Sequence, residues 1–488
     1  MSETEPSPDE FFKIRREKKQ QLQANGINPY PYQFDRTEHS TEAKAMFDPS
    51  AEEELGETVR VAGRITARRV HGKATFLDLS DEQGTIQIYV SEGYLDREEQ
   101  YQEIDEFWDV GDYAGVHGEL FETNEGEISV VARNLTLLSK GLRPLPEKFH
   151  GLQDIELRYR KRYLDLLSNP DVREIFHVRS EFIFSLRRQL REQSFTEVET
   201  PMMQTLAGGA EAEPFQTHHN ALDIDLFLRV APELFLKRLL VGGFERVFEI
   251  NRNFRNEGVS SRHNPEFTML ELYEAYADYH DIMERTEQMV SQAIMDSTGS
   301  MVTEFESKTI DWTPPWSRRT MLALIEDRTG LNLSVDQSAE EIFDKAHEAG
   351  IAVEPTEKTG AQIMEVFEEA VETSLIDPTF VTQFPSDICP LAKSHREIRG
   401  VSERFELFAG GLEIGNAYSE LNDPVLQREK FEEQADSPEQ IDEDFLEALE
   451  YGMPPAGGLG LGIDRFSMLI TGSESIRDVI LFPLMKQE

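Results

Sequence analysis

The sequence predicts an α+β protein in which a small all-β barrel precedes a large domain built on an antiparallel sheet flanked by helices. The first observation is a run of five short strand patterns, with glycines at the bends, between about 59 and 138. The second is a helical pattern over 171–195 that leads into strand and helix patterns reaching the C-terminus. The third is a pair of hairpin patterns in that larger region, around 248–273 and 402–423.

The chain divides into four expected segments. Residues 1–50 are an acidic tail and a basic helix, 51–145 form the barrel, 146–168 are a linker, and 169–488 form the large domain. Within the large domain, the mostly helical pattern at about 320–375 indicates an insertion. Five strands over this length suit a compact barrel of the OB type, a fold that often binds single-stranded nucleic acid, although other small barrels give a similar pattern.

The helical pattern before the barrel carries the densest basic cluster of the chain. Its members are Lys13, Arg15, Arg16, Lys18 and Lys19. Such a cluster is either a solvated helix face or a contact for RNA, and the sequence favours neither interpretation.

Net charge is the unusual property of this chain. Its 93 Asp and Glu outnumber 49 Lys and Arg, which gives a formal charge of −44. Nucleic-acid-binding proteins are usually basic, because neutralising phosphates supplies much of their affinity. The surface is either acidic simply for solubility or adapted to concentrated salt, where the Debye length falls to about 3 Å at 1 M and repulsion is screened. We favour the second interpretation.

Cysteine and hydropathy patterns bear on the compartment. Cys389 is the single cysteine, which excludes disulfide frameworks and cysteine-based zinc sites and suits a reducing cytoplasm. No run of about 18 apolar residues is present, so no membrane partner is expected. The N-terminal residues lack a basic region followed by an apolar one, so the expected location is cytoplasmic.

The pattern at 248–273 predicts two antiparallel strands that form a polar cradle. A strand over 248–257 would project Arg255 and Glu257 from one face, and a loop of about ten residues would lead to a second strand carrying Phe267. An arginine fork can bridge a phosphate and a carboxylate. A glutamate can accept a hydrogen bond from an adenine amino group, and a phenylalanine ring can stack on the base.

The glycine-rich stretch GGLGLGIDRF at 457–466 is a second candidate ligand site. Its spacing does not fit the dinucleotide pattern G-x-G-x-x-G, and no phosphate-binding G-x-x-x-x-G-K-[ST] loop occurs in the chain. Glycines there would let the backbone approach a ligand closely, and Arg465 could hold a terminal phosphate.

The second hairpin, around Gly410-Gly411, predicts a pair of carboxylates on one face. Pairing across the turn places Phe408 opposite Glu413 and Leu407 opposite Ile414, with Glu406 on the same face as Glu413. Two such carboxylates suit Mg²⁺ that bridges ATP phosphates. We also predict a β-bulge at Gly415, because only a bulge would rotate the later residues Asn416, Tyr418 and Glu420 onto that face.

These elements resemble motifs 1, 2 and 3 of the class II aminoacyl-tRNA synthetases. FTEVETPMM, with Pro201, is similar to motif 1, FRNEG followed by RHNPEF to motif 2, and GLGLGIDRF to motif 3. The similarity extends from about residue 10 to the end and is closest to the lysyl enzymes of bacterial type. It implies a class II catalytic domain preceded by an OB-fold anticodon-binding domain. It also implies a homodimer that attaches L-lysine to tRNA(Lys) with ATP and Mg²⁺.

The resemblance also implies roles for individual residues. The expected catalytic residues are Arg255 and Arg465. The expected ATP contacts are Arg255, Glu257, His263, Asn264, Phe267, Glu406, Gly462 and Arg465, and the expected magnesium ligands are Glu406 and Glu413. The expected lysine contacts are Gly209, Glu233, Arg255, Glu271, Tyr273, Asn416 and Glu420. The expected anticodon contacts are Arg69, Phe76 and Gln87, although Phe76 could instead be a barrel-core aromatic.

The chemistry of the expected pocket favours lysine over the related substrates. A desolvated ammonium needs several acceptors, which Glu271, Glu420 and Tyr273 would supply, whereas an aspartate pocket would need a cationic residue. Three alternatives remain at this level: an aspartyl or asparaginyl synthetase of the same subgroup, an enzyme that lysylates a protein, and a non-catalytic RNA-binding paralogue. The barrel argues against the second, and the intact Arg255 and Arg465 argue against the third.

Overall fold

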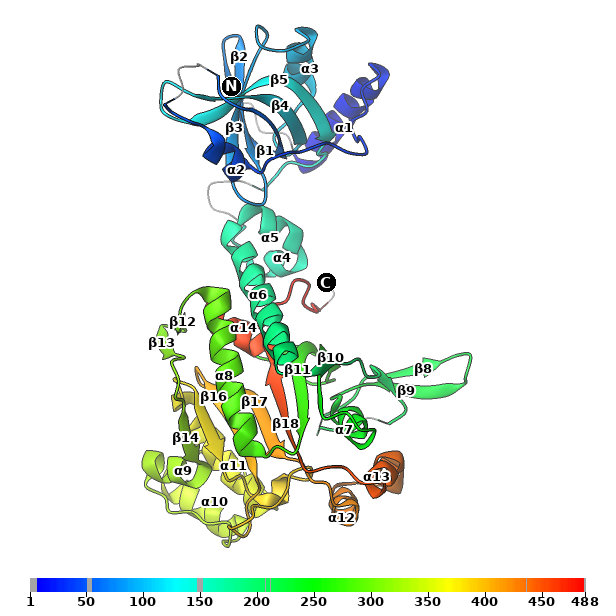
Figure 1. Cartoon of the computed structure of the whole chain (residues 1–488), viewed down its shortest axis with the longest axis vertical. Helices are drawn as coiled ribbons and strands as arrows, with labels where there is room; N and C mark the ends of the chain where they lie inside the picture. The colour runs from blue at the N-terminus through cyan, green and yellow to red at the C-terminus, as the bar shows by residue number, and fades with distance from the viewer. Residues whose placement is uncertain are drawn as a thin grey trace. The chain divides into compact units, whose positions relative to one another are not determined.

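The computed structural model describes residues 7–50, 55–146, 152–206, 208–210, 212–435 and 437–486. The chain forms two compact units, Met1–Gly151 and Leu152–Glu488 (Figure 1). Within the described residues, no helix combines the length and the apolar character needed to cross a membrane.

The first unit is a closed five-stranded barrel with strand order β1-β2-β3-β5-β4. Its strands are β1 (Thr58–His71), β2 (Ala74–Ser80), β3 (Thr85–Ser91), β4 (Tyr113–Glu122) and β5 (Ile128–Ser139), and its helices are α1 (Pro8–Ala24), α2 (Ser40–Met46) and α3 (Glu99–Phe107). Buried and half-buried positions alternate along β2 and β3, which places one side of each strand in the barrel core. The predicted OB barrel is confirmed.

Helix α1 uses part of its basic cluster to hold the first unit together. Arg15 is 7% exposed, and its guanidinium donates to the backbone carbonyls of Val110, Gly141 and Arg143. Lys18 pairs with Asp109 at 2.7 Å. Arg15 is therefore not on a solvated helix face, and Lys18 is partly engaged within the first unit.

The second unit contains an eight-stranded sheet of order β14-β15-β16-β17-β18-β11-β10-β6. Its strands are β6 (Thr196–Glu197), β10 (Arg246–Phe254), β11 (Glu266–Ala275), β14 (Ser317–Thr320), β15 (Thr379–Thr382), β16 (Arg404–Ala409), β17 (Leu412–Ser419) and β18 (Ala456–Gly462). All neighbouring pairs are antiparallel except β6 with β10 and β14 with β15. The predicted α+β class with an antiparallel sheet is confirmed.

Helices cover one face of this sheet. These helices are α6 (Pro170–Glu192), α8 (Tyr279–Thr298) and α14 (Ile463–Thr471), and α6 and α8 lie across the strands in Figure 1. Apolar residues on alternate strand positions, among them Phe248, Leu270 and Leu272, pack against Phe182 of α6 and Phe466 of α14. The intervening residues of the same strands must therefore point to the opposite face.

The remaining elements surround the sheet. They are β7 (Met203–Gln204), β8 (Gln216–His219), β9 (Ile224–Leu228), β12 (Val302–Phe305), β13 (Lys308–Asp311), α7 (Glu233–Val241), α12 (Pro424–Gln434), η2 (Ser386–Ile388), η3 (Pro438–Gln440) and α13 (Glu443–Glu450). Between β14 and β15 the chain forms α9 (Met321–Thr329), α10 (Ala339–Glu348), α11 (Thr359–Ala370) and η1 (Glu372–Ser374). These last four elements occupy the region in which the sequence predicts a helical insertion.

The predicted bulge is present in β17. Phe408 pairs with Glu413 as expected, but Leu407 pairs with Gly415, so the predicted pairing of Leu407 with Ile414 is wrong by one residue. Ile414 is the extra residue of the bulge, directly before Gly415. Beyond it, Glu406 pairs with Asn416. The bulge thus places Asn416 on the same face as Glu406 and Glu413, which a regular strand could not do.

The first hairpin differs from the prediction at one strand end. β10 and β11 pair as expected from Arg246 opposite Glu274 to Phe254 opposite Glu266. β10 ends at Phe254, so Arg255 and Glu257 lie in the loop and the prediction of a strand through Glu257 is wrong. The loop stays close to β11, because the Arg255 N–H donates to the carbonyl of Pro265 at 2.9 Å.

The start of the second unit is anchored by a buried ion pair. The predicted linker, part of which lies outside the described residues, includes the short helices α4 (Ile155–Arg160) and α5 (Arg162–Ser168). Arg162 and Asp165 are both 0% exposed and pair at 2.6 Å. The Arg162 guanidinium also donates to backbone carbonyls near the C-terminus, those of Arg477, Ile480 and Leu481.

Arg162→Met is expected to destabilise the second unit by about 3–5 kcal/mol, because it removes one partner of a buried ion pair and leaves buried carbonyls without a donor. Urea unfolding followed by circular dichroism measures the change. The matched control is Arg187→Met, whose pair with Glu197 is 40% and 37% exposed, and it should cost less than about 1 kcal/mol. Equal effects of the two substitutions would contradict the anchoring role.

Candidate active site

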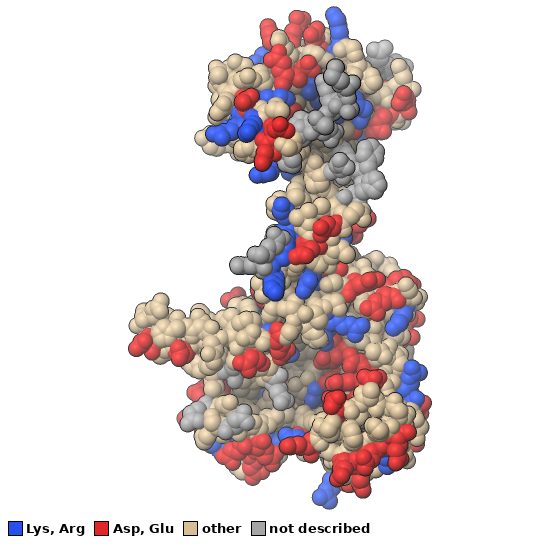
Figure 2. All heavy atoms as spheres, turned by 180° about the vertical axis from the view of Figure 1, so that it is seen from behind, with Lys and Arg blue, Asp and Glu red and all other residues tan. Residues whose placement is uncertain are grey.

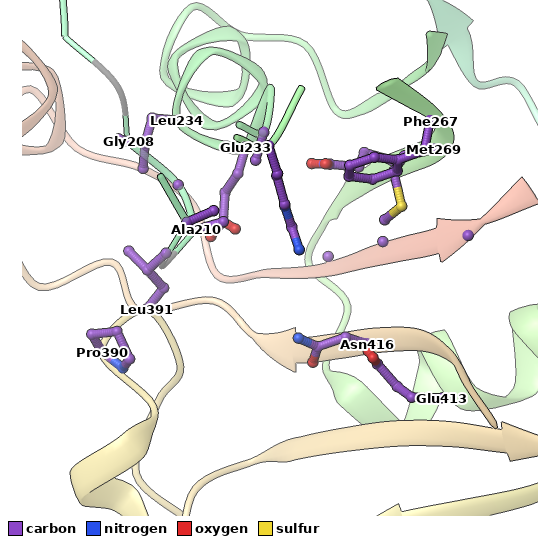
Figure 3. A pocket seen from close by; sticks show the side chains of 18 of the residues that line it. Gly208, Ala210, Glu233, Leu234, Phe267, Met269, Pro390, Leu391, Glu413 and Asn416 are labelled. Atoms are coloured by element: carbon purple, nitrogen blue, oxygen red, sulfur yellow. The ribbon is translucent and has the colours of Figure 1, made fainter. Parts of the chain in front are cut away.

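A cavity of about 890 Å³ lies on the sheet face opposite the helical layer. Figure 3 shows Phe267 and Met269 of β11 on one side of β18, and Glu413 and Asn416 of β17 on the other, with Glu233 approaching from the start of α7. Most residues expected in the ATP and amino-acid sites line it: Gly209, Glu233, Arg255, Glu257, His263, Asn264, Phe267, Glu271, Tyr273, Glu413, Asn416, Gly462 and Arg465. Segments far apart in the sequence therefore meet at one cavity.

The glycines of β18 leave room for the polar groups of this cavity. A Cβ on Gly458 would lie 2.0 Å from Oε1 of Glu420 and 2.5 Å from the ring of Tyr273. A Cβ on Gly460 would lie 3.1 Å from Cε of Met269. Any larger residue at Gly458 would displace the neighbouring side chains, so the glycines determine the shape of the cavity.

Arg255 offers an unpaired guanidinium to the cavity. Its Cζ lies 5.2 Å from the centroid of the Phe267 ring, a favourable arrangement of a cation and an aromatic face. Its Nε is buried without a hydrogen-bond partner, and within the described residues the guanidinium forms no ion pair. A buried donor group of this kind is suited to an anionic ligand such as a phosphate or a carboxylate.

Arg465 is the second guanidinium of the cavity, and two neighbours orient it. It donates to the backbone carbonyl of Glu413 at 2.6 Å, to a side-chain oxygen of Glu413 at 3.1 Å, and to Nε2 of His263 at 3.1 Å. Because arginine only donates, Nε2 of His263 must accept, which leaves the ring proton on Nδ1 beside Ser260. Burial and the charge of Arg465 lower the pKa of His263, which favours this neutral form.

The expected metal carboxylates are close enough to influence each other. Burial and the neighbouring Glu413 raise the pKa of Glu406 to about 7, although the Arg404 guanidinium offsets part of the rise. Glu406 is 4% exposed, pairs with Arg404 and does not itself line the cavity. Arg404 does line it, although it is not among the residues expected from the sequence. Its register opposite Tyr418 in the hairpin could have indicated it.

One end of the cavity is acidic and largely desolvated. Glu271 is 5% exposed and has no ion-pair partner within the described residues, although the Tyr273 hydroxyl lies 3.5 Å from it. Burial and the nearby Glu233 raise its pKa to about 8. Asn416 donates to the hydroxyl of Tyr418, and its own carbonyl oxygen is buried without a donor. These acceptors together are suited to a cationic ligand.

The expected residue Glu420 lies at this end but does not line the cavity. It is 0% exposed and pairs with Lys237 at 2.6 Å. Lys237 also pairs with Glu233, one turn earlier on α7, at 2.6 Å. Lys237 is not among the residues expected from the sequence, although a glutamate four residues before a lysine on a helix is a pattern that predicts such a pair. Gly209 adopts φ +88° beside Glu233, a conformation that favours glycine.

In the barrel, the three expected anticodon residues lie close together on neighbouring strands. Arg69 pairs in register with Phe76, and Gln87 pairs with Asp78, which also holds the Arg69 guanidinium at 2.7 and 2.9 Å. Phe76 is half-buried outside the core and packs on Tyr89 with ring centroids 5.1 Å apart. The alternative that Phe76 is a barrel-core aromatic is therefore wrong.

Comparison with known proteins decides the family. Residues 154–486 match the model of class II tRNA synthetases of the D, K and N group, and residues 59–138 match the OB-fold nucleic acid binding domain of the anticodon-binding type. The chain is 53% identical to a lysine–tRNA ligase of Pelotomaculum thermopropionicum, over 98% of this chain and 95% of that protein. The chain belongs to the lysine–tRNA ligase family.

Further relatives support this family over the full length. A lysine–tRNA ligase of Syntrophomonas wolfei is 50% identical over 100% of this chain and 99% of its own length. One of Carboxydothermus hydrogenoformans is 50% identical over 98% of each chain. The predicted class II catalytic domain preceded by an OB-fold domain is thereby confirmed.

Glu271→Gln is expected to flatten the pH dependence of stability in the ligand-free protein. The pKa of Glu271 is about 8 in the folded chain and 4.5 without the fold, so the folded chain holds a proton that the unfolded chain releases. Stability should therefore fall as pH rises from about 5 to about 8, by up to about 1.4 kcal/mol per pH unit from this group. The variant lacks that contribution. Melting temperatures measured across this pH range test the difference.

The matched control for this experiment is Glu284→Gln, which changes an exposed glutamate of α8. It should reproduce the wild-type pH dependence. If the melting curves of Glu271→Gln and wild type run parallel, the buried, unpaired state of Glu271 is contradicted.

Proposed function

We propose that this protein is a lysine–tRNA ligase. It activates L-lysine with ATP to give lysyl-adenylate and pyrophosphate, and then transfers the lysyl group to the 3′ end of tRNA(Lys). The observation that carries the proposal is the charge distribution of one cavity. Arg255 and, at the acidic end, the buried Glu271 both line it, and neither has an ion-pair partner among the residues that the structure describes. An amino acid with a cationic side chain and a free carboxylate fits both groups.

The acidic end argues against the related substrates. Aspartate would bring a second carboxylate to Glu233, Glu271 and Glu420, which like-charge repulsion and burial would strongly oppose. Asparagine would leave the buried carboxylates without a cation. In the proposal, the side-chain ammonium of lysine donates to Glu271, Tyr273 and the buried Glu420, the α-amino group is assigned to Glu233 and Gly209, and Asn416 completes the pocket.

Arg255 and Arg465 are the catalytic residues of the proposal. A carboxylate oxygen of lysine attacks the α-phosphorus of ATP, the bond to the β-phosphate oxygen breaks, and pyrophosphate leaves. Arg255 bridges the reacting carboxylate and the α-phosphate, and Arg465 holds the terminal phosphate. The adenine stacks on Phe267 and bonds to Glu257, while His263, Asn264 and the backbone at Gly462 complete the ATP site. Positioning and charge stabilisation suffice, without a protein nucleophile.

The second step uses the same cavity. A hydroxyl of the terminal ribose of tRNA attacks the carbonyl carbon of the lysyl-adenylate, its proton is released, and AMP leaves with the electrons of the broken bond. Arg255, which has no other ion-pair partner among the described residues, remains beside the α-phosphate to stabilise its charge.

Glu406 and Glu413 are the proposed ligands of Mg²⁺. Burial and the charge of Glu413 raise the pKa of Glu406, and a divalent cation between the two carboxylates would stabilise their ionised forms. Two carboxylates suit a Mg²⁺ ion that is also held by ATP phosphates. Such an ion would neutralise phosphate charge when bound.

The barrel supplies the proposed anticodon contacts, Arg69, Phe76 and Gln87. The strands β1–β3 combine this guanidinium with the neighbouring rings of Phe76 and Tyr89, a combination that suits unpaired bases. A homodimer through the motif 1 region, including Pro201, and a cytoplasmic location complete the proposal.

Acidic side chains are spread over the visible face of both units (Figure 2), and with the charge of −44 they support function in concentrated salt, where tRNA repulsion is screened.

The test of the function is amino-acid-dependent exchange of labelled pyrophosphate into ATP, measured with lysine, aspartate and asparagine. Lysine alone is expected to support exchange. Arg255→Ala should lower the rate by about 10³-fold or more, because it removes charge stabilisation at the reacting phosphate. Its melting temperature should stay near wild type, since the guanidinium forms no ion pair among the described residues.

The matched control is Arg252→Ala on the same hairpin, whose pair with Glu266 is half-exposed and 3.8 Å long. It should keep nearly full exchange. Exchange that depends on aspartate or asparagine in place of lysine would refute the substrate, and normal exchange in folded Arg255→Ala would refute the role of that residue.

Phe76→Ala is expected to raise the KM for tRNA about tenfold in aminoacylation, because a base loses a stacking platform worth about 1–3 kcal/mol. Pyrophosphate exchange, which needs no tRNA, should not change. Tyr113→Ala serves as a control, since Tyr113 is an exposed aromatic of β4 stacked on Arg64. Equal KM values for Phe76→Ala and wild type across a salt series would contradict the anticodon role.

A further inference from the structure

Lys237 brings an internal ammonium to the acidic end of the cavity. Its Nζ lies 2.6 Å from Oε1 of Glu233 and 2.6 Å from Oε2 of Glu420. All three side chains are almost fully buried, with exposed fractions of 0% for Lys237 and Glu420 and 4% for Glu233. Lys237 is not among the residues that line the cavity, so its ammonium reaches both carboxylates from within the protein.

The environment keeps Lys237 charged. Burial by itself would lower the pKa of Lys237, but the two carboxylates more than offset this, and the pKa is raised overall. An ammonium with no access to water is tolerated only when its partners are ionised and hold it in good geometry. Lys237 and its two carboxylates therefore form one unit, in which the position of each carboxylate depends on the same ammonium.

The formal charges at this end add up in a way that matches the proposed substrate. Glu233, Glu271 and Glu420 carry three negative charges when ionised, and Lys237 reduces the sum to two. Lysine carries two ammonium groups, and its carboxylate faces Arg255. Without Lys237, the three negative charges of the carboxylates would exceed the two positive charges of the lysine ammonium groups. One of the three carboxyl groups would then have to be protonated.

We infer that Lys237 is a positioning residue that determines amino-acid specificity, because its ammonium fixes the separation of Glu233 and Glu420 and sets the charge of the acidic end. The inference rests on the proposed function, in which Glu233 receives the α-ammonium and Glu420 the side-chain ammonium of lysine. A fixed separation of two acceptors selects the length of a diammonium substrate. Ornithine, which is one methylene shorter, is the substrate that this arrangement rejects.

The pH dependence of kcat/KM for lysine should depend on the charge of Lys237. The charged and titratable groups around the three carboxylates are Arg229, Glu249, Arg255, Tyr273, Lys393 and Tyr418. Among the described residues, none of these groups pairs directly with Glu420, so Lys237 is the cation that lowers the pKa of Glu420 most. Burial acts in the opposite direction, and the pKa of Glu420 is raised overall to about 8. Loss of the Lys237 charge must therefore move ionisation of this site to higher pH.

The test uses Lys237→Gln, which keeps hydrogen-bond donors but removes the charge, in the full-length protein. In pyrophosphate exchange, the KM for lysine should rise at least tenfold while the KM for ATP stays the same. The rising limb of kcat/KM for lysine against pH should shift upward by one unit or more. The ratio of kcat/KM for lysine to that for ornithine should fall at least tenfold.

Lys345→Gln is the matched control, because this half-buried lysine of α10 lies in the helical insertion and, among the described residues, donates only to the carbonyl of Asn332. All three readouts should stay at wild-type values. If Lys237→Gln does not fold, Lys237→Arg is the second variant, because it keeps the positive charge between Glu233 and Glu420 but changes the position of the donor groups. It should still lower the lysine-to-ornithine ratio at least tenfold.

The outcomes separate the inference from the function on which it rests. Wild-type protein that shows no lysine-dependent exchange contradicts the proposed function. Active wild type together with an unchanged lysine-to-ornithine ratio in the folded variant overturns the inference alone. A loss of rate or stability without a shift of the pH limb or of the ratio also overturns it, because that pattern indicates a purely structural lysine.

Discussion

The division of one sheet into an apolar face and a polar face is the constraint on which the rest of the second unit depends. On β11, Leu270 and Leu272 enter the helical core, while the alternating residues Glu271 and Tyr273 point into the cavity. The bulge at Ile414 extends this division to β17, since it places Asn416 on the same face as Glu413. Without it, the carboxylates of the hairpin and the amide of Asn416 would lie on opposite faces, and no single ligand could contact them all.

The buried carboxylates on that polar face differ in their ion-pair partners. Glu406 is held by Arg404, and Glu420 by Lys237. Glu271, which lines the cavity, has no ion-pair partner among the described residues, and burial raises its pKa to about 8. The proposed function assigns the cation of the substrate to this unpaired acid, and an anion of the substrates to Arg255.

The strongly acidic composition says little about these sites. A net charge of −44 would argue against an RNA partner, yet the family of the chain and its OB-fold domain support one. Affinity depends on the local arrangement of charge rather than on the net charge of the whole chain. The basic helix α1 shows the converse, because its Arg15 serves the interior of the first unit and not a partner.

The sequence by itself determined the strand alternation of β11, the hairpin with its bulge, the barrel and the residue types at the cavity, since these follow from local periodicity, from glycines and from motif spacing. Only the tertiary structure decided that β10 ends at Phe254, that Arg15 is internal, and that Lys237 and Arg404 neutralise Glu420 and Glu406. Such facts depend on which distant segments meet and on how much water they exclude. The spacing of residues along the chain does not indicate which segments meet or how much water they exclude, because burial and pairing arise only when separate strands and helices pack together.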